Sequence, residues 1–249
     1  MGVGKMAEVK LILGDCLEEM PKIVDKSIDM ILCDLPYGTT ACKWDTIIPF
    51  EPLWEQYKRI IKDNGAIVLT AQTPFDKILG SSNLEMLRYE WIWQKEQGTG
   101  GGNANKMPLK DHENILIFYK KLPNYNPQFS EGKPYKLNRK KPKVLSVYGK
   151  TGFDETFLKV NTGSRYPKTV IKFNKEYGLH PTQKPVALFE YLIKTYTNEG
   201  DLVLDNCAGS GTTGVACKNL KRNCILIEKD EEYFKIAERR INQTTENLL

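Results

Sequence analysis

Asp34 and Tyr37 belong to the stretch DLPYG, which follows the apolar run ILC at residues 31–33. The run is typical of a buried strand, and a turn after it needs Pro36 and Gly38 but neither a carboxylate nor an aromatic ring. Ligands of open α/β sheets bind at the carboxyl ends of the strands. Asp34, Pro36 and Tyr37 are therefore candidate catalytic residues.

A second carboxylate, Asp205, ends an apolar run in LVLDNCAGSGTTGVA at residues 202–216. Three glycines spaced G-x-G-x-x-G start at Gly209, and Glu228 ends the next apolar run. The spacing is similar to the fingerprint of dinucleotide sites, where pyrophosphate rests on the start of a helix. Asp205 would repel a pyrophosphate at that place but attract an ammonium group.

A ligand with a ribose, no phosphate and an amino-acid tail fits this turn, and S-adenosylmethionine is such a ligand. Gly209 and Gly211 would let the backbone approach it, Asp205 could bind its α-amino group, and Glu228 its ribose hydroxyls. A nicotinamide-dependent oxidoreductase on a Rossmann fold is the alternative of a different class. It would leave the DLPY stretch unexplained.

Alternating apolar patterns predict the elements that hold these residues. Strands are expected at 9–13, 28–33, 65–71, 90–95, 113–120, 201–205 and 223–228, and helices at 51–62, 185–198, 212–220 and 230–243. Strands that alternate with helices predict an α/β fold with a mostly parallel sheet covered on both faces.

Composition excludes several classes of protein. The chain has 249 residues, 41% of them hydrophobic, but no apolar run approaches the roughly 18 residues of a membrane span. The start of the sequence lacks the apolar stretch of a signal peptide, so a cytoplasmic protein is expected. The six cysteines form no C-x-x-C pair and there are only two histidines, so neither a metal site nor a disulfide framework is expected.

The net charge of +5 is unevenly distributed. Between Lys120 and Lys150 nine lysines and arginines stand against Glu131 alone, among prolines and aromatic residues. A basic segment in an otherwise mildly acidic chain is typical of a surface that binds a polyanion. The candidate DNA-binding residues are Lys133, Lys136, Arg139, Lys140, Lys141 and Lys143. On charge alone, a solvated insertion would be as good an interpretation.

Taken together, Asp34-Leu35-Pro36-Tyr37 and the stretch from Asp205 to Thr213 resemble the amino-methyltransferases of DNA, with their D-P-P-Y and D-P-F-x-G-S-G-T-T motifs. The resemblance also covers HPTQKPVALFEYLI before the glycine turn. The catalytic motif comes first, as in the circularly permuted β class of phage or restriction-modification enzymes. Leu35 in place of the first proline and Asn206-Cys207 in place of Pro-Phe depart from the pattern at positions that act through backbone and packing.

The resemblance implies a Rossmann-like methyltransferase fold with a mostly parallel seven-stranded sheet. Residues 1–120 would form the catalytic half, 121–176 a target-recognition insertion, and 177–249 the cofactor-binding half. The implied cofactor-binding residues are Asp15, Cys16, Asp34, Thr182, Lys184, Asp205, Ala208, Gly209, Gly211, Thr212, Thr213 and Glu228. Among these, Asp15 would bind the adenine of the cofactor or cap a helix beginning near Leu17, and Lys184 would lie near the methionine carboxylate.

The implied reaction is methylation of N6 of adenine in a specific double-stranded DNA sequence. The target base must leave the helix to be reached, and Tyr37 would stack on it. In most members of the resembling family an aspartate at the first position of the tetrapeptide accompanies methylation of adenine, so Asp34 favours adenine N6. Methylation of cytosine N4 is the alternative. RNA or protein-glutamine methylation and a non-catalytic nucleic-acid-binding module are further rivals. The resemblance also suggests a homodimer and a bacterial or phage-encoded protein in the cytoplasm.

Overall fold

The computed structural model describes residues 7–38, 45–138, 158–176 and 183–244. The chain divides into two compact units. The main unit combines Met1–Asn126 with Thr169–Leu249, and the insertion unit is Pro127–Lys168. Thr182, Arg139, Lys140, Lys141 and Lys143, all predicted site residues, lie outside the described part of the chain.

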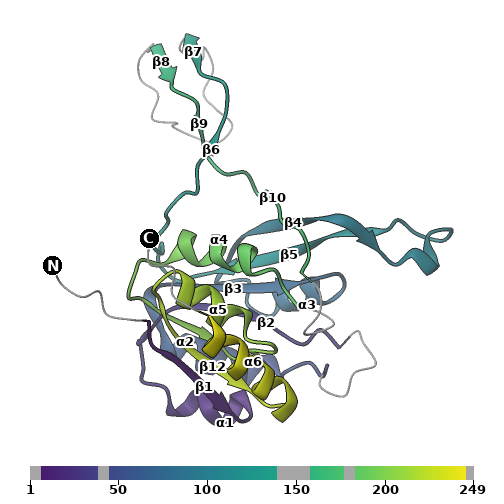
Figure 1. Ribbon diagram of the computed structural model, residues 1–249, viewed down its shortest axis with the longest axis vertical. Coiled ribbons are helices and arrows are strands. Elements are labelled where there is room, and N and C mark those ends of the chain that lie inside the picture. Colours follow the sequence, from purple (N-terminus) through teal and green to yellow (C-terminus); the bar gives the residue numbers. More distant parts are fainter. Residues whose placement is uncertain (1–6, 39–44, 139–157, 177–182, 245–249) are drawn as a thin grey trace. The chain divides into compact units, whose positions relative to one another are not determined.

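An eight-stranded sheet runs through the main unit in the order β1-β12-β11-β2-β3-β5-β4-β10 (Figure 1). All neighbouring strands are parallel except that β5 is antiparallel to both β3 and β4. The predicted α/β fold with a mostly parallel sheet is thus confirmed. The strands are β1 Val9–Leu13, β2 Ile28–Asp34, β3 Ile61–Ala71, β4 Leu87–Thr99, β5 Lys110–Phe118, β10 Val170–Lys172, β11 Leu202–Asp205 and β12 Asn223–Glu228.

The expected number of seven strands was wrong by one. The eighth strand is β10, in which Val170–Lys172 pairs with Ile92–Gln94 of β4 and Ile171 is buried in the core. Strand β10 belongs to the main sheet and follows the compact insertion unit, which ends at Lys168, and the target-recognition role of residues 121–176 stays a prediction. A three-residue strand is too short to show the periodicity that marked the other strands.

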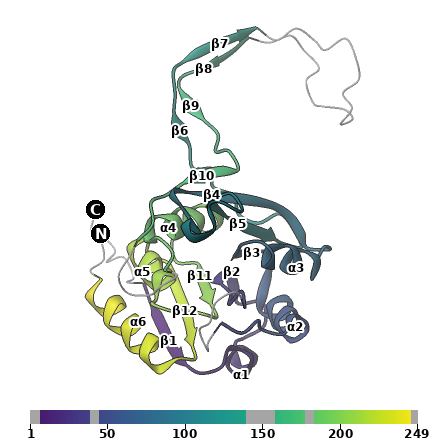
Figure 2. The ribbon, with the colours of Figure 1, turned by 90° about the vertical axis from the view of Figure 1, so that its right-hand side faces the viewer.

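Helices cover both faces of the sheet (Figure 2). On one face lie α4 Val186–Tyr196, α5 Thr212–Asn219 and α6 Glu231–Gln243, and on the other lie α1 Cys16–Glu19, α2 Phe50–Ile60 and α3 Phe75–Ser81. Strand β2 shows how the sequence builds two cores, because successive side chains of a strand point to opposite faces. Met30 and Leu32 pack into the core beneath α4 and α5, whereas Ile31 and Cys33 pack into the core beneath α2.

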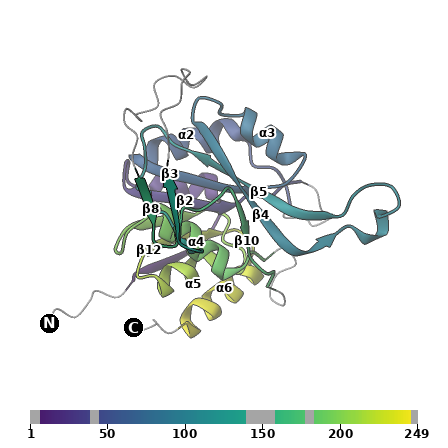
Figure 3. The same ribbon diagram turned by 90° about the horizontal axis from the view of Figure 1, so that it is seen from above.

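The predicted elements match the observed ones within a few residues at most ends. Strand β12 and the Asp230 cap of α6 agree with the expectation, since the Asp230 carboxylate accepts hydrogen bonds from the backbone N–H groups of Glu232 and Tyr233. Helix α3 was not predicted, and β4 and β5 are longer than expected. These two strands form a hairpin that projects beyond the helices (Figure 3), with a 3₁₀ turn at Gly101–Asn103 near its tip.

Two short antiparallel pairs build the insertion unit. Strand β6 Ser130–Glu131 pairs with β9 Ser164–Arg165, and β7 Tyr135–Asn138 pairs with β8 Leu158–Asn161. The guanidinium of Arg165 lies 4.7 Å from the centre of the Tyr135 ring. Lys133 and Lys136 are exposed in this unit, as a DNA-binding role would require.

Within the described ranges, no helix is long and apolar enough to cross a membrane. The same residues contain no group of three or more histidine, cysteine or acidic side chains arranged to hold a metal ion.

Candidate active site

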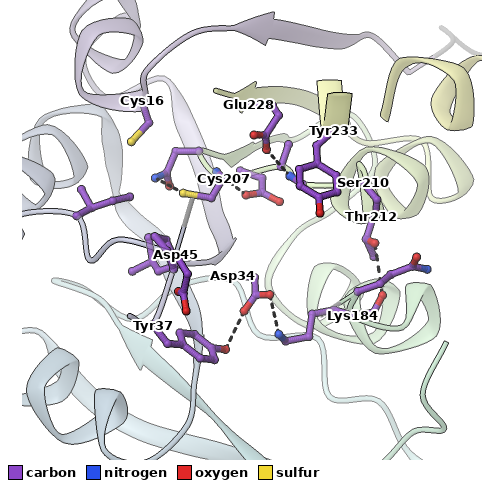
Figure 4. A pocket seen from close by; sticks show the side chains of 18 of the residues that line it. Cys16, Asp34, Tyr37, Asp45, Lys184, Cys207, Ser210, Thr212, Glu228 and Tyr233 are labelled. Carbon is purple, nitrogen blue, oxygen red and sulfur yellow. Dashed lines mark hydrogen bonds and ion pairs between the residues drawn. The ribbon is translucent and has the colours of Figure 1, made fainter. Parts of the chain in front are cut away.

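A cavity of about 800 Å³ lies at the carboxyl ends of β1, β2, β11 and β12. Neighbouring strands β2 and β11 are in register at Ile31 and Leu204, so their terminal carboxylates, Asp34 and Asp205, lie at the same edge of the sheet. Eleven of the residues predicted from the sequence line this cavity: Asp15, Cys16, Asp34, Pro36, Tyr37, Lys184, Asp205, Ala208, Gly209, Thr212 and Glu228. Figure 4 shows Asp34 between Tyr37 and Lys184.

Both carboxylate oxygens of Asp34 accept hydrogen bonds from side chains. Oδ1 accepts from the Tyr37 hydroxyl at 2.7 Å and from the Thr70 hydroxyl. Thr70 is available because it lies directly beside Asp34 in the register of β2 with β3. Oδ2 accepts from Lys184 Nζ at 2.6 Å (Figure 4). Strand pairing and the DLPY turn therefore hold one oxygen, and a residue preceding α4 holds the other.

Lys184 joins Asp34 to a second buried carboxylate. Its Nζ lies 3.3 Å from Oε2 of Glu113, and Oε1 of Glu113 accepts a hydrogen bond from Lys95 at 2.5 Å. Burial alone would lower the pKa of Lys184, but the carboxylates of Asp34 and Glu113 outweigh it and raise that pKa. Burial alone would raise the pKa of Glu113, yet Lys184 and Lys95 hold it below its usual value. The Lys184 ammonium and the Glu113 carboxylate therefore each favour the charged form.

The Tyr37 ring is held from several sides. It stacks on Phe75 with ring centres 5.1 Å apart, and Lys184 Nζ lies 5.5 Å from its centre. Burial raises the pKa of the Tyr37 hydroxyl, with further contributions from the Asp34 and Glu113 carboxylates. The phenol therefore stays protonated and donates to Asp34. The Asp45 carboxylate accepts a hydrogen bond from the Gly38 N–H at 2.8 Å, which fixes the end of the DLPYG turn.

Asp205 has a different environment. Its Oδ2 accepts from the Thr213 hydroxyl at 2.5 Å and its Oδ1 from the Cys207 backbone N–H at 3.1 Å. The residue is 2% exposed, and burial raises the pKa of its carboxyl to about 6. In the described part of the chain no ion pair joins Asp205 to a lysine or arginine. A ligand that brings an ammonium group would supply the missing positive charge.

The two glycines of the turn differ in what they accommodate. Gly209, at φ +52°, has no atom within 4 Å of the place a Cβ would occupy, so its face toward the cavity is open to a ligand. Its N–H donates to Oε2 of Glu228 at 2.7 Å. Gly211, at φ +79°, lies against α6, where a Cβ would be 2.9 Å from that of Ala237. Close helix packing, rather than approach of a ligand, explains Gly211.

Asp15 caps helix α1, and its predicted contact with the adenine of the cofactor stays a prediction. Its carboxylate accepts a hydrogen bond from the Leu17 N–H at 2.9 Å and so caps α1, and it also lines the cavity. A second partner is Lys229, whose Nζ lies 2.9 Å away and lowers the pKa of Asp15. Cys16 is buried beside it. Thr213 does not line the cavity, but its hydroxyl donates a hydrogen bond to Oδ2 of Asp205.

Sequence reasoning missed Thr70, Lys95 and Glu113. Glu113 begins the strand pattern ENILIFYK, and a carboxylate at the start of a buried strand was the one available signal. Thr70 and Lys95 gave none, because their roles arise only from strand pairing. Lys184 was expected near the methionine carboxylate of the cofactor, whereas the structure shows it in contact with Asp34.

Comparison with known proteins gives a consistent result. The family described as DNA methylase matches residues 28–239. The type II methyltransferase M.HpaI of Haemophilus parainfluenzae is 30% identical over 254 residues, which cover 94% of this chain and 74% of the relative. The DNA adenine methyltransferase YhdJ of Escherichia coli K12 is 30% identical over 262 residues, which cover 94% and 83%.

Among solved structures, the complex of M1.HpyAVI with S-adenosylmethionine (SAM) is similar, with a TM-score of 0.63 and 27% identity over 93% of this chain and 99% of that one. The resemblance seen in the sequence motifs is therefore confirmed, and the nicotinamide alternative loses its support. The family match spans most of the main unit and both aspartate-containing strand ends. This chain belongs to the DNA methylase family.

Proposed function

We propose that this enzyme transfers the methyl group of S-adenosylmethionine to N6 of adenine in a specific sequence of double-stranded DNA. The observation that carries the proposal is the single cavity in which Asp34, ending β2, meets the glycine turn that follows Asp205. The relative named a DNA adenine methyltransferase supports the choice of base.

The cavity fits the cofactor. Asp205 offers a buried carboxylate that forms no ion pair with a described residue and is proposed to bind the α-amino group. Gly209 leaves the backbone open, and Glu228, which lines the same cavity, is proposed to bind the ribose hydroxyls. Bound here, S-adenosylmethionine would supply a methyl group on a positively charged sulfur. Asp15, at the end of β1, lies beside the same cavity for the adenine amino group.

Asp34 has the central part in the chemistry. The amino group of adenine is a poor nucleophile because its lone pair is delocalised into the ring. When Asp34 and the backbone carbonyl of Leu35 or Pro36 each accept one N–H, the nitrogen moves toward tetrahedral geometry and directs its lone pair at the methyl group. The new N–C bond forms as the S–C bond breaks, which leaves the neutral demethylated cofactor, and the proton that the methylated nitrogen loses passes to the Asp34 carboxylate that already accepts it. Orientation of reactants about 3 Å apart supplies much of the remaining acceleration.

Tyr37 supports the flipped base and the carboxylate together. Phe75 stacks on the Tyr37 ring and the Tyr37 hydroxyl donates to Oδ1 of Asp34, and the flipped base is proposed to stack on the same ring. Stacking of a base on an aromatic ring contributes about 1–3 kcal/mol. Tyr37 therefore orients the acceptor and the substrate with one side chain.

The segment 121–176, with its insertion unit, is proposed to recognise the DNA sequence. Lys133 and Lys136 are exposed there, and the exposed rings of Phe129 and Tyr166 lie 4.8 Å apart. A homodimer and a cytoplasmic location in bacteria are proposed from the family resemblance. Sedimentation of the enzyme with and without DNA would measure the oligomeric state.

Mass spectrometry of nucleosides tests the proposed function. DNA is incubated with enzyme and S-adenosylmethionine, digested and analysed, with the Asp34→Ala variant as control. N6-methyladenine is expected with the wild type and not with the variant. N4-methylcytosine without N6-methyladenine would favour the cytosine alternative.

A further inference from the structure

Lys184 donates a hydrogen bond to the oxygen atom of Asp34 that would accept the target amino group in the proposed reaction. Oδ1 of Asp34 accepts hydrogen bonds from Tyr37, in the turn after β2, and from Thr70, in the neighbouring strand β3. Oδ2 is the remaining acceptor for an amino group, and Lys184 Nζ binds it at 2.6 Å. The amino group of the target adenine cannot donate its N–H to Oδ2 from the side that Lys184 occupies until the Lys184 ammonium has moved.

An ammonium resembles the amino group that would replace it. Both are nitrogen donors, and a lysine carries its charge as a compact group on a flexible four-carbon chain. Lys184 is 5% exposed, so the ammonium cannot move into bulk water without leaving a buried place. A second site within the protein must receive it.

Glu113 offers that second site. Its Oε1 is held by Lys95, whereas its Oε2 is buried and accepts no hydrogen bond from any described residue. Lys184 Nζ already lies 3.3 Å from Oε2 as an ion pair. A buried acceptor without a well-aligned donor is unfavourable. A short movement of the ammonium away from Asp34 would satisfy Oε2.

We propose that Lys184 holds the place of the target amino group on Asp34 in the free enzyme and moves to Glu113 when the base enters. This inference rests on the proposed function, in which Asp34 accepts the amino N–H. Lys184 is then a positioning residue that keeps Asp34 oriented before the substrate arrives. Glu113 is the receiving group, and Lys95 anchors it.

The charges support an exchange rather than a proton transfer. Two carboxylates, Asp34 and Glu113, face two ammonium groups, Lys184 and Lys95, so this set of four groups is neutral before and after the movement. Lys184 keeps its proton in both positions because a carboxylate is within reach in each. It therefore does not act as the base that removes the proton of the methylated amino group.

The test is a double-mutant cycle on the single-turnover rate of methylation, with saturating S-adenosylmethionine and a duplex that carries the recognition sequence. The variants are Glu113→Gln, Lys184→Met and the double variant. Lys62→Met, which breaks the half-exposed pair of Lys62 with Asp29, serves as control. Circular dichroism and the affinity for S-adenosylmethionine are measured for each protein.

Glu113→Gln is expected to slow methylation by about 10- to 100-fold, because the ammonium loses its receiving charge and stays on Asp34. Adding Lys184→Met should restore most of that loss, since no ammonium then has to move. A double variant at least as slow as Glu113→Gln would overturn the proposal. So would a loss of cofactor affinity in Lys184→Met alone, which would place Lys184 at the cofactor.

A binding measurement keeps the inference testable where Glu113→Gln does not fold. The affinity for duplex with adenine at the target position is compared with that for duplex with purine, which lacks the 6-amino group. Lys184→Met should raise the preference for adenine, because the amino group no longer competes with an ammonium. An unchanged preference would overturn the inference. If wild-type enzyme does not methylate adenine at all, the proposed function itself has failed.

Discussion

Two neighbouring parallel strands, β2 and β11, both end on an aspartate, yet the two carboxylates have opposite surroundings. Asp34 carries a cation of the protein, Lys184, on one oxygen. Asp205 is 2% exposed, and among the described residues its two oxygens accept hydrogen bonds from the neutral donors Thr213 and Cys207. The same residue type at equivalent strand ends therefore has a neutralised charge in one case and an unsatisfied charge in the other.

The difference in partners favours different roles for the two carboxylates, one toward the cofactor and one toward the substrate. In the proposed function, the carboxylate without a cation, Asp205, binds the α-amino group of S-adenosylmethionine. A carboxylate that already has a cation can exchange it for a neutral amino group while the buried set of charges stays neutral. The position of the two aspartates at the strand ends does not distinguish these roles. The side chains that contact each aspartate do distinguish them.

Among the variants considered, replacement of Asp34 should change the methylation rate most. Asp34→Ala is expected to lower the single-turnover methylation rate on the order of 100- to 1,000-fold, the usual loss for one polar group that acts in the transition state. Calorimetric affinity for S-adenosylmethionine should stay near the wild-type value. Asp63→Ala, at a surface ion pair, is the matched control. If Asp34→Ala lowered the methylation rate and the cofactor affinity equally, the two aspartates would not have the separate roles proposed here.

Asp205→Asn should have the reverse profile. Cofactor affinity should fall about 10- to 100-fold, because a charged hydrogen bond is lost. The free protein should become more stable at pH 7, because a pKa of about 6 in place of the model-peptide 3.8 means that ionising this buried carboxyl costs roughly 3 kcal/mol. Calorimetry and thermal unfolding measure the two effects. A variant with unchanged affinity would show that Asp205 is not the partner of the α-amino group.

The pH dependence sharpens the same point. The folded-state pKa of Asp205 is raised, so the folded protein binds the extra proton and loses stability as pH rises from about 4 to about 6. An ammonium ligand prefers the ionised carboxylate. Affinity for S-adenosylmethionine should therefore rise about tenfold between pH 5 and pH 7. Asp205→Asn should flatten this rise, and a wild-type profile that is already flat would contradict the assignment.

The smallest expected effect concerns the insertion. If Lys140, Lys141 and Lys143 contact phosphates, their joint replacement by alanine should reduce the slope of log affinity against log salt by about 0.9 per lost contact. Replacing Lys22, Lys62 and Lys235 of the main unit in the same way should not. An unchanged slope in the first set would place the DNA elsewhere, for example at the glycine-rich hairpin near Gly101.

Much of the fold was predictable because buried strands and amphipathic helices leave periodic patterns. The register that places Leu204 beside Ile31 was not, although both strand ends were predicted as ligand-binding positions. Strand β10 escaped prediction because three residues carry no period. Helix α3 escaped because its seven residues, Phe75–Ser81, follow a proline-containing turn and show only two large buried side chains, Phe75 and Leu79.

The site was predictable where a motif lies in one stretch of sequence, as for Asp34, Tyr37 and Asp205. It was not predictable where residues from separate strands meet. Glu113 lies 79 positions after Asp34 in the sequence and reaches it only through Lys184. Lys184 itself was identified, but the identity of its partner is a property of tertiary packing.

The central claim is that Asp34 in this cavity directs methylation to adenine N6. Single-molecule sequencing of DNA from cells that express the wild-type protein or Asp34→Ala tests it most directly, because base, position and recognition sequence are obtained together. N6-methyladenine is expected in one recurring sequence with the wild type and not at all with the variant. Methylation confined to cytosine N4, or an equal N6-methyladenine signal from both proteins, would contradict it.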